Sequence, residues 1–273
     1  MSILQHITSR RIKIKQDLLN QWLKEEKQAH IKGWDFSHIR DRYIEEDALP
    51  WNLRTVIKKY LDNDTKLLDM ETGGGEFLLS LGHPTNKTSA IEGYKPNVKY
   101  CKEPLLPLGI DFKEADGKDQ LPFDDNLFDI VTNRHGDYNV KELKRVLKKD
   151  GLFITQQVGA ENDRELIKLL QPEITTLPYP KQYLEIRKSE LIENGFEILE
   201  SCEVFQPIRF YDVGALVWFA KIIEWEFPNF SVKTHLQNLY TAQNILQTKG
   251  VIEGHIHRFY FVAKNKFYMQ KKL

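Results

Sequence analysis

Three acidic side chains follow short apolar runs of the chain and could bind a nucleoside. Asp69 lies in the run of residues 66–70, Glu92 closes the run of residues 89–92, and Asp116 follows the run of residues 110–113. Glu92 stands 23 residues after Asp69. A carboxylate at the tip of the second strand of a nucleotide-binding α/β sheet, about 20 residues beyond the glycine fingerprint, accepts ribose hydroxyls. The spacing therefore predicts Glu92 at a ribose and Asp116 beside a base. The alternative for both is an ordinary strand-end carboxylate.

A glycine turn stands between Asp69 and the next helical pattern. Gly73, Gly74 and Gly75 permit positive φ and remove Cβ atoms, so a ligand can lie against the main chain there. A dinucleotide fingerprint would need a further glycine at the position of Leu78, which disfavours NAD and FAD. Because no Lys-Ser or Lys-Thr pair follows the glycines at phosphate-loop spacing, a nucleoside triphosphate is disfavoured too.

The elements around these motifs alternate short apolar runs with helical periodicity, which is typical of βαβ units and a mostly parallel sheet. We predict strands at 66–70, 89–92, 110–113, 128–132, 152–157, 196–205 and 257–263, and an amphipathic helix at 10–29. The predicted organisation is a single domain, residues 1–273. Its parts are an N-terminal helical extension at 1–51, a core at 52–205, an inserted helical cap at 206–255, and a last strand and tail at 256–273.

The run from Leu67 to Gly75 resembles the first motif of the class I S-adenosylmethionine-dependent methyltransferases, in which an acid and an apolar residue precede G-x-G-x-G. Residues 121–131 and 142–151 are similar to the later motifs of the methyltransferase type 11 group, and the resemblance covers residues 50–200. It implies a doubly wound, Rossmann-like α/β sheet, mostly parallel with an antiparallel last strand. It also implies S-adenosylmethionine as cofactor, bound by Asp69, Glu71, Gly73, Gly75, Glu92, Gly93, Asp116, Gly117 and Asn133.

Glu71 departs from this pattern because the family has its first glycine there. Its side chain either enters the loop that normally receives the methionyl carboxylate, where it weakens cofactor binding or changes the contacts, or turns toward a neighbouring helix. The same residue keeps open a relative of the fold that binds a nucleoside without transferring methyl.

Methyl transfer from a sulfonium is an in-line displacement, so the protein chiefly aligns the acceptor, and a base is needed only when the acceptor must lose a proton. His135, after the fourth predicted strand, is the candidate base, with a turn-capping role as the alternative. The predicted substrate contacts, each with a structural alternative, are Trp51, Arg134, Gln156 and Trp218. No Asn/Asp-Pro-Pro-Tyr motif follows the fourth strand, so adenine N6 is disfavoured as acceptor.

The balance of charge limits the classes of partner that we expect. Lys plus Arg and Asp plus Glu both number 39, so no overall field draws the chain to nucleic acid. Two cysteines fit a reducing compartment, and no stretch reads as a membrane span, so a cytoplasmic enzyme is expected. His255 and His257 are two ligands without a third, so no metal is expected. We predict a small or medium-sized acceptor under the cap, with an RNA methyltransferase as the alternative and the oligomeric state open.

Overall fold

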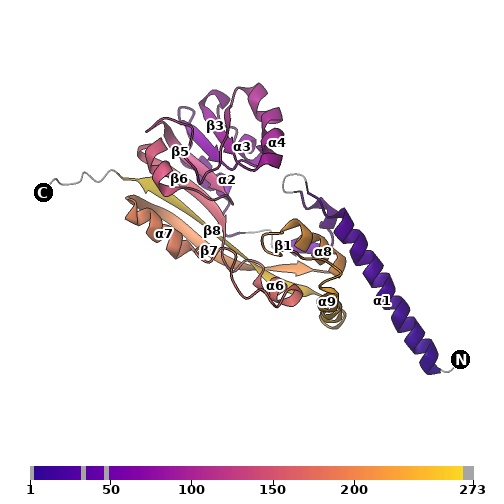
Figure 1. Cartoon of the computed structure of the whole chain (residues 1–273). Helices are drawn as coiled ribbons and strands as arrows, with labels where there is room; N and C mark the ends of the chain where they lie inside the picture. Colours follow the sequence, from indigo (N-terminus) through magenta and orange to yellow (C-terminus); the bar gives the residue numbers. More distant parts are fainter. Residues whose placement is uncertain (1–2, 32–34, 46–48, 267–273) are drawn as a thin grey trace. The chain divides into compact units, whose positions relative to one another are not determined.

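The computed structural model describes residues 3–31, 35–45 and 49–266, and its strands form one eight-stranded sheet (Figure 1). The strands are β1 (Tyr43–Glu45), β2 (Leu67–Met70), β3 (Thr88–Glu92), β4 (Asp111–Glu114), β5 (Phe128–Arg134), β6 (Leu147–Val158), β7 (Phe196–Phe210) and β8 (Ile252–Asn265). Their order is β1-β7-β8-β6-β5-β2-β3-β4. The predicted fold class is confirmed.

The centre of the sheet is parallel. β2 pairs in parallel with both β3 and β5, β3 with β4, and β5 with β6, whereas β8 runs antiparallel to β6. All four positions of β2 are buried, as expected for a parallel strand covered on both faces. The three-residue strand β1, antiparallel to β7, was not predicted.

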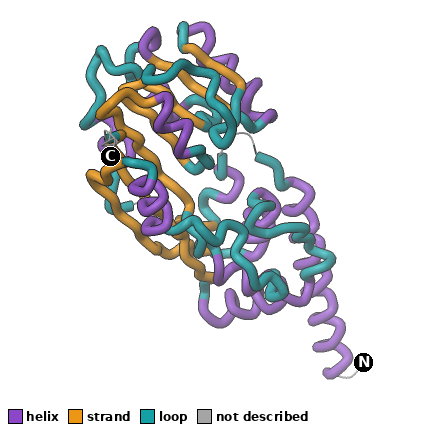
Figure 2. The backbone as a smooth tube through the Cα atoms, turned by 60° about the vertical axis from the view of Figure 1, so that its left-hand side comes forward, coloured by secondary structure: helices purple, strands orange, loops and turns teal. Residues whose placement is uncertain are grey.

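The helices connect these strands and are drawn in purple in Figure 2. They are α1 (Ile3–Gln28), α2 (Leu53–Lys58), α3 (Glu76–Ser80), α4 (Lys95–Leu105), α5 (Val140–Val146), α6 (Arg164–Leu170), α7 (Leu184–Glu193), α8 (Val213–Ile222) and α9 (Leu236–Lys249), with 3-10 turns at Ser37–Ile39, Thr85–Lys87 and Leu106–Leu108. Side-chain oxygens cap several of them. Asn52 accepts from the Thr55 amide at 3.0 Å, and Asn139 accepts from the Lys141 amide at 3.0 Å, which starts α2 and α5.

The chain divides into two compact units. The first contains Met1–Asp47, Glu161–Pro178 and Phe205–Ile256, and the second contains Ala48–Ala160, Tyr179–Val204 and His257–Leu273. Most of the predicted extension and cap belongs to the first unit, and most of the predicted core belongs to the second. Residues 1–2, 32–34, 46–48 and 267–273 of these predicted parts lie outside the described residues. The division into one domain with additions stays a prediction.

The second unit has a hydrophobic layer on each face of its strands. Leu67, Ile130 and Ile154 point to one face, where α2, α3 and α4 cover them. Leu68 and Val131, each the next residue of its strand, point to the other face under α5 and α7. Successive side chains of a strand alternate between faces, so this doubly wound arrangement follows from runs that are apolar at every position.

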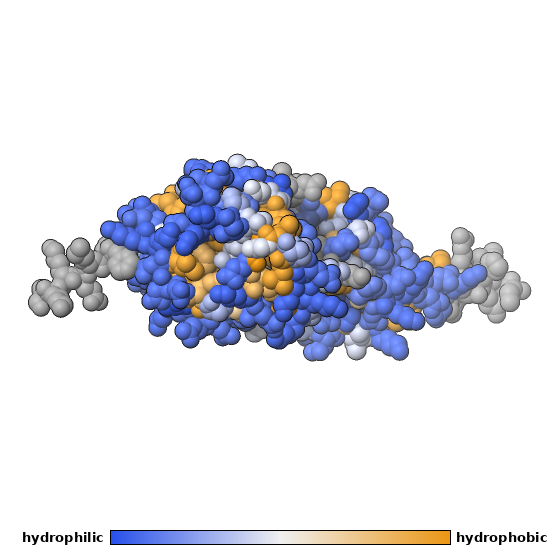
Figure 3. Space-filling view, turned by 90° about the horizontal axis from the view of Figure 1, so that it is seen from above, coloured by the Kyte–Doolittle hydropathy of each residue, from blue (hydrophilic) through white to orange (hydrophobic). Residues whose placement is uncertain are grey.

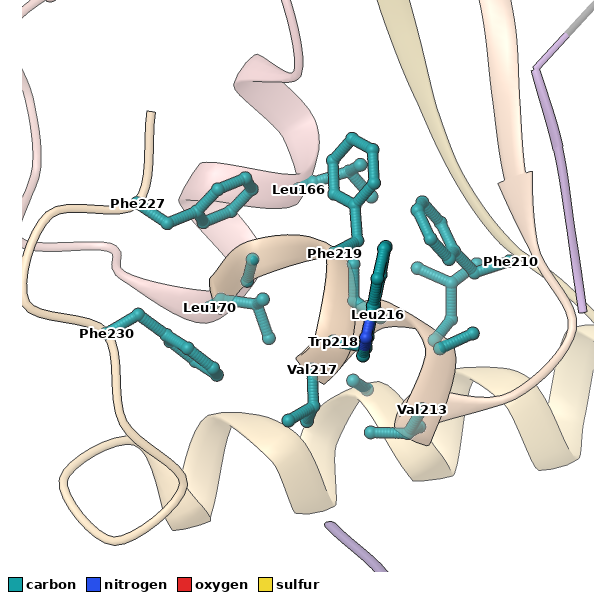
Figure 4. Close-up of a cluster of buried hydrophobic side chains, with 14 of the residues drawn as sticks. Leu166, Leu170, Phe210, Val213, Leu216, Val217, Trp218, Phe219, Phe227 and Phe230 are labelled. Atoms are coloured by element: carbon teal, nitrogen blue, oxygen red, sulfur yellow. The ribbon is translucent and has the colours of Figure 1, made fainter. Parts of the chain in front are cut away.

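The first unit packs around α8, whose residues 213–220 are all buried (Figure 4). A helix that is apolar all round is a core helix. Trp22 of α1 packs on Tyr240 of α9, with ring centroids 5.4 Å apart. Arg42 donates to Asp212 at 2.7 Å and to Glu25 at 2.8 Å. The N-terminal helix and the inserted helices, distant in sequence, therefore share one core.

The face seen in Figure 3 is mostly hydrophilic, with hydrophobic residues gathered in patches among hydrophilic ones. Mixed surfaces of this kind are usual in folded proteins. Within the described part of the chain, no helix combines the length and the apolar character needed to cross a bilayer.

Candidate active site

The parallel strands of the second unit bring the predicted acids to one edge. Met70 at the end of β2 pairs in register with Asn133 of β5 and with Ile91 of β3, so the three strands end together. Asp69 lies under this edge, buried, and accepts from the Thr132 hydroxyl at 2.7 Å. Burial raises the pKa of Asp69, and the Thr132 hydrogen bond opposes the rise. Asp69 is therefore a buried residue of β2, and its predicted contact with a cofactor stays a prediction.

The glycine turn is held to the next strand by Glu92. The Gly73 amide donates to Glu92 Oε2 at 2.8 Å, and the Tyr94 amide donates to Glu92 Oε1 at 2.8 Å. Gly73 and Gly75 have φ values of 64° and 86°, a region that favours glycine. The Cys101 thiol donates to the Gly73 carbonyl. Turn and carboxylate thus form one hydrogen-bonded group at the carboxyl ends of β2 and β3.

Glu71 crosses this edge and does not turn toward a neighbouring helix. Its Oε1 accepts from the Gly117 amide at 2.7 Å, and its Oε2 accepts from the Gly93 amide at 3.4 Å. Its backbone has a φ of 55°, unusual outside glycine. Gly136 makes room for the side chain, because a Cβ there would lie 2.4 Å from Glu71 Cγ. Three predicted cofactor residues, Glu71, Gly93 and Gly117, are therefore in direct contact.

Glu71 and Glu92 form a pair of carboxyl groups that titrate together. Burial raises the pKa of Glu71 to about 7, and the negative charge of Glu92 adds to the rise, while the Gly117 amide opposes it. Burial also raises the pKa of Glu92, against hydrogen bonds from Tyr94, Gly73 and Glu71. Like charges this close do not both ionise readily. The pair consequently keeps a proton near neutral pH.

The remaining predicted cofactor residues lie on the ends of β4 and β5. Asp116 accepts from the Lys118 amide at 2.9 Å through Oδ1. Asn133 is buried, and its Oδ1 accepts from Gln157 at 2.6 Å and from the Thr155 hydroxyl at 3.2 Å. These bonds fix the Asn133 amide at the strand end. Its predicted contact with a cofactor stays a prediction.

Three of the residues predicted for the acceptor meet in one network. The Trp51 indole N–H donates to Gln156 Oε1 at 2.8 Å, and Gln156 Nε2 lies 3.4 Å from His135 Nε2. Trp51 also packs on Tyr260, with ring centroids 4.9 Å apart. His135 stands in the left-handed region with a φ of 65°, and its side chain is exposed. Such conformations cluster at functional sites.

Residues 68–155 match the family model for a methyltransferase domain. Demethylmenaquinone methyltransferase from Staphylococcus aureus is 30% identical over 115 residues, which cover 38% of this chain and 47% of that protein. The matched segment thus spans about half the length of this relative. Two solved structures share the fold over 79% of this chain and 99% of theirs. They are a putative methyltransferase from Bacillus halodurans (TM-score 0.54, 19% identity) and the YcgJ protein from Bacillus subtilis (TM-score 0.53, 18% identity).

The chain therefore shares the fold of these two structures, and its residues 68–155 are similar to methyltransferase domains.

Two cationic side chains, Arg134 and Arg258, lie near His135. The positive charges of their guanidinium groups oppose protonation of its ring. Arg134 lies over the Phe77 ring at 4.6 Å. Sequence reasoning missed Arg258 of β8. The sequence feature that could have indicated it is an arginine directly before the apolar run of residues 259–263.

Trp218 and the two histidines of β8 have other partners. Trp218 is 1% exposed in the core of the first unit, stacked on His38 with ring centroids 5.3 Å apart, and its predicted substrate contact stays a prediction. His255 lies 3.2 Å from Glu165, and His257 lies 2.9 Å from Glu203. In the described ranges, no three His, Cys, Asp or Glu side chains gather as metal ligands.

Proposed function

We propose that this protein transfers a methyl group from S-adenosylmethionine to a small or medium-sized acceptor. The observation that carries the proposal is the position of Glu92, which the Gly73 and Tyr94 amides hold at the end of β3 beside the glycine turn. A carboxylate at this position of a nucleotide-binding sheet accepts ribose hydroxyls. The match of residues 68–155 to a methyltransferase domain supports the same cofactor.

In this proposal the chain mainly binds and orients. When bound, the cofactor supplies a methyl group on a positively charged sulfur. Glu92 holds the ribose and Asp116 lies beside the base. Gly73 leaves room for the ligand against the main chain, because nothing lies within 4 Å of where its Cβ would stand. Alignment of an acceptor within such a site supplies most of the rate, because the displacement needs a fixed line of attack.

Calorimetry with S-adenosylmethionine and its demethylated product tests the cofactor. We expect saturable binding, and stabilisation by about 2.7 kcal/mol at 100 times the dissociation constant. Glu92→Ala should weaken binding by about 1.5–3 kcal/mol, the size of a hydrogen bond to a charged group. Glu114→Ala is the matched control, since Glu114 pairs in register with Glu92 but bonds to Lys95 at the surface. Absence of heat and of thermal stabilisation with both ligands contradicts the proposal.

A second candidate is a nucleoside-binding protein that transfers no methyl. Glu71 favours it, because its carboxyl group already occupies the amides of Gly117 and Gly93. The two candidates differ in the ligands between which they should discriminate. A methyltransferase should bind S-adenosylmethionine and its demethylated product with clearly different affinity from adenosine, whereas a nucleoside-binding relative should bind all three alike.

The partners and the compartment belong to the same proposal. The described cysteines, Cys101 and Cys202, are both free thiols, which supports the cytoplasm. The balanced charge of the chain supports a small acceptor over RNA. Tight RNA binding whose affinity falls steeply as the salt concentration rises would indicate RNA as the acceptor instead.

A further inference from the structure

The order of donors and acceptors around Gln156 is fixed by a tryptophan. An indole N–H can only donate a hydrogen bond. The Gln156 atom that faces it at 2.8 Å must therefore be the carbonyl oxygen, Oε1. Trp51 is nearly closed to solvent and packs on Tyr260, so it holds this orientation. The Gln156 NH2 group then faces the Nε2 of His135, at 3.4 Å.

This order determines where His135 carries its proton. An amide NH2 donates only, so the His135 nitrogen that faces it must offer a lone pair. A neutral imidazole with a lone pair on Nε2 has its hydrogen on Nδ1. Protonation at Nε2 would bring two N–H groups together. The guanidinium charges of Arg134 on β5 and Arg258 on β8 also oppose an imidazolium, although Arg134 itself faces the negative charges of Asp69 and Glu76.

We propose that His135 serves as a neutral Nδ1–H donor to an ionised oxygen of the methyl acceptor, and that Trp51 and Gln156 are positioning residues that set this tautomer. The inference rests on the proposed function. His135 is an exposed residue, and among the described residues no protein group bonds to its Nδ1. The same two guanidinium groups that disfavour a positive ring favour a negative acceptor.

The acceptor class follows from this arrangement. It is a phenolate, an enolate or a carboxylate, already ionised when it reacts. A lone pair on its oxygen forms the new O–C bond, the S–C bond breaks, and the pair of that bond stays on sulfur. The negative charge on oxygen and the positive charge on sulfur cancel, so no proton moves. His135 therefore has no proton to take and acts by binding the oxyanion.

Nitrogen-15 NMR of the histidine side chains in the full chain tests the tautomer without any turnover. We expect the His135 resonance, assigned by its loss in His135→Asn, to show hydrogen on Nδ1 and a lone pair on Nε2 throughout the neutral range. Hydrogen on Nε2, or an imidazolium at neutral pH, overturns the proposal. Calorimetry with S-adenosylmethionine on the same sample shows separately whether the proposed function holds.

Two variants test the positioning residues. Gln156→Glu presents a carboxylate that accepts from both Trp51 and an imidazolium, so it should raise the pKa of His135 and move hydrogen onto Nε2. Trp51→Phe keeps a ring against Tyr260 but removes the N–H, so it should allow both tautomers. Gln120→Glu adds the same charge at an exposed position and should leave the His135 signals unchanged. Identical His135 signals in all three variants contradict the positioning role.

4-Nitrophenol probes the acceptor class, with 4-nitroanisole as the analogue that cannot ionise. We expect the phenolate to shift the Nδ1–H signal of His135 in a saturable way and the anisole to leave that signal unchanged. His135→Gly, which suits the positive φ but has no N–H, should weaken phenolate binding on the order of 10- to 100-fold. His135→Asn, whose amide N–H lies near the Nδ1 position, should recover part of that loss. No saturable shift, or equal binding by Asn and Gly variants, overturns the acceptor class.

Discussion

At pH 8 the Glu71→Gln variant is expected to unfold at a higher temperature than the unmodified protein, and the difference should disappear toward pH 5. The folded protein holds the pKa of Glu71 at about 7, against 4.5 for an ordinary glutamate. Between these values the folded state keeps a proton that the unfolded state has lost, so stability falls as the pH rises through this window. Above pH 7 the penalty is fully present, on the order of a few kcal/mol for the Glu71 and Glu92 pair as a whole.

Glutamine removes the penalty but keeps the geometry. Its carbonyl can accept from the Gly117 amide, and its NH2 can donate to Glu92, while the longer bond from the Gly93 amide, at 3.4 Å, is lost. Thermal unfolding of both proteins between pH 5 and pH 8 measures the effect. Glu114→Gln is the control, because Lys95 lowers the pKa of that exposed carboxyl and the variant should gain no stability at high pH. Parallel stability curves for Glu71→Gln and the unmodified protein would show that Glu71 ionises normally.

The Phe219→Ala variant should lose about 3–5 kcal/mol of the stability of the first unit, as buried Phe→Ala changes do. Phe219 is 3% exposed and lies edge-on to Phe210, with ring centroids 5.1 Å apart (Figure 4). Removal of the ring leaves a cavity between α8, the helix at the centre of that core, and Phe210. Hydrogen exchange of the α8 amides, followed with a denaturant titration, measures the loss.

Phe205→Ala is the matched control, because the same ring is 53% exposed there. Exposed substitutions usually change stability by less than about 0.5 kcal/mol. If the two variants lost the same stability, the packing of α8 would not determine the stability of the first unit.

The parallel sheet could be predicted because each central strand is an apolar run between turns. The run of residues 66–70 covers β2, and the run of residues 128–132 covers most of β5. β1 escaped prediction, since three residues with one exposed isoleucine give no alternation to detect. β7 continues to Phe210 beyond the predicted end at 205, because Ile208 and Phe210 point into the core of the first unit. That burial is a tertiary contact and has no local signature.

The sequence allowed us to predict which residues lie at the site, but not which of their side chains contact one another. Spacing brought Glu92 and Asp116 to successive strand ends, which the register of β2, β3 and β4 bears out. The course of the Glu71 side chain could not be read from sequence, because it depends on Gly117 and Gly136, 46 and 65 residues away. The order Trp51, Gln156, His135 likewise joins three separate segments, and only the folded chain shows it.

The thiol at the glycine turn has a consequence for chemical modification. Cys101 is buried and donates to the Gly73 carbonyl, and burial raises its pKa to about 12. Alkylating reagents and peroxide react with thiolates, and at neutral pH Cys101 supplies on the order of one thiolate in 10⁵. Cys202 on β7 is partly open to solvent. A maleimide fluorophore should therefore attach at a single position of the folded chain, with no need to mutate the other cysteine.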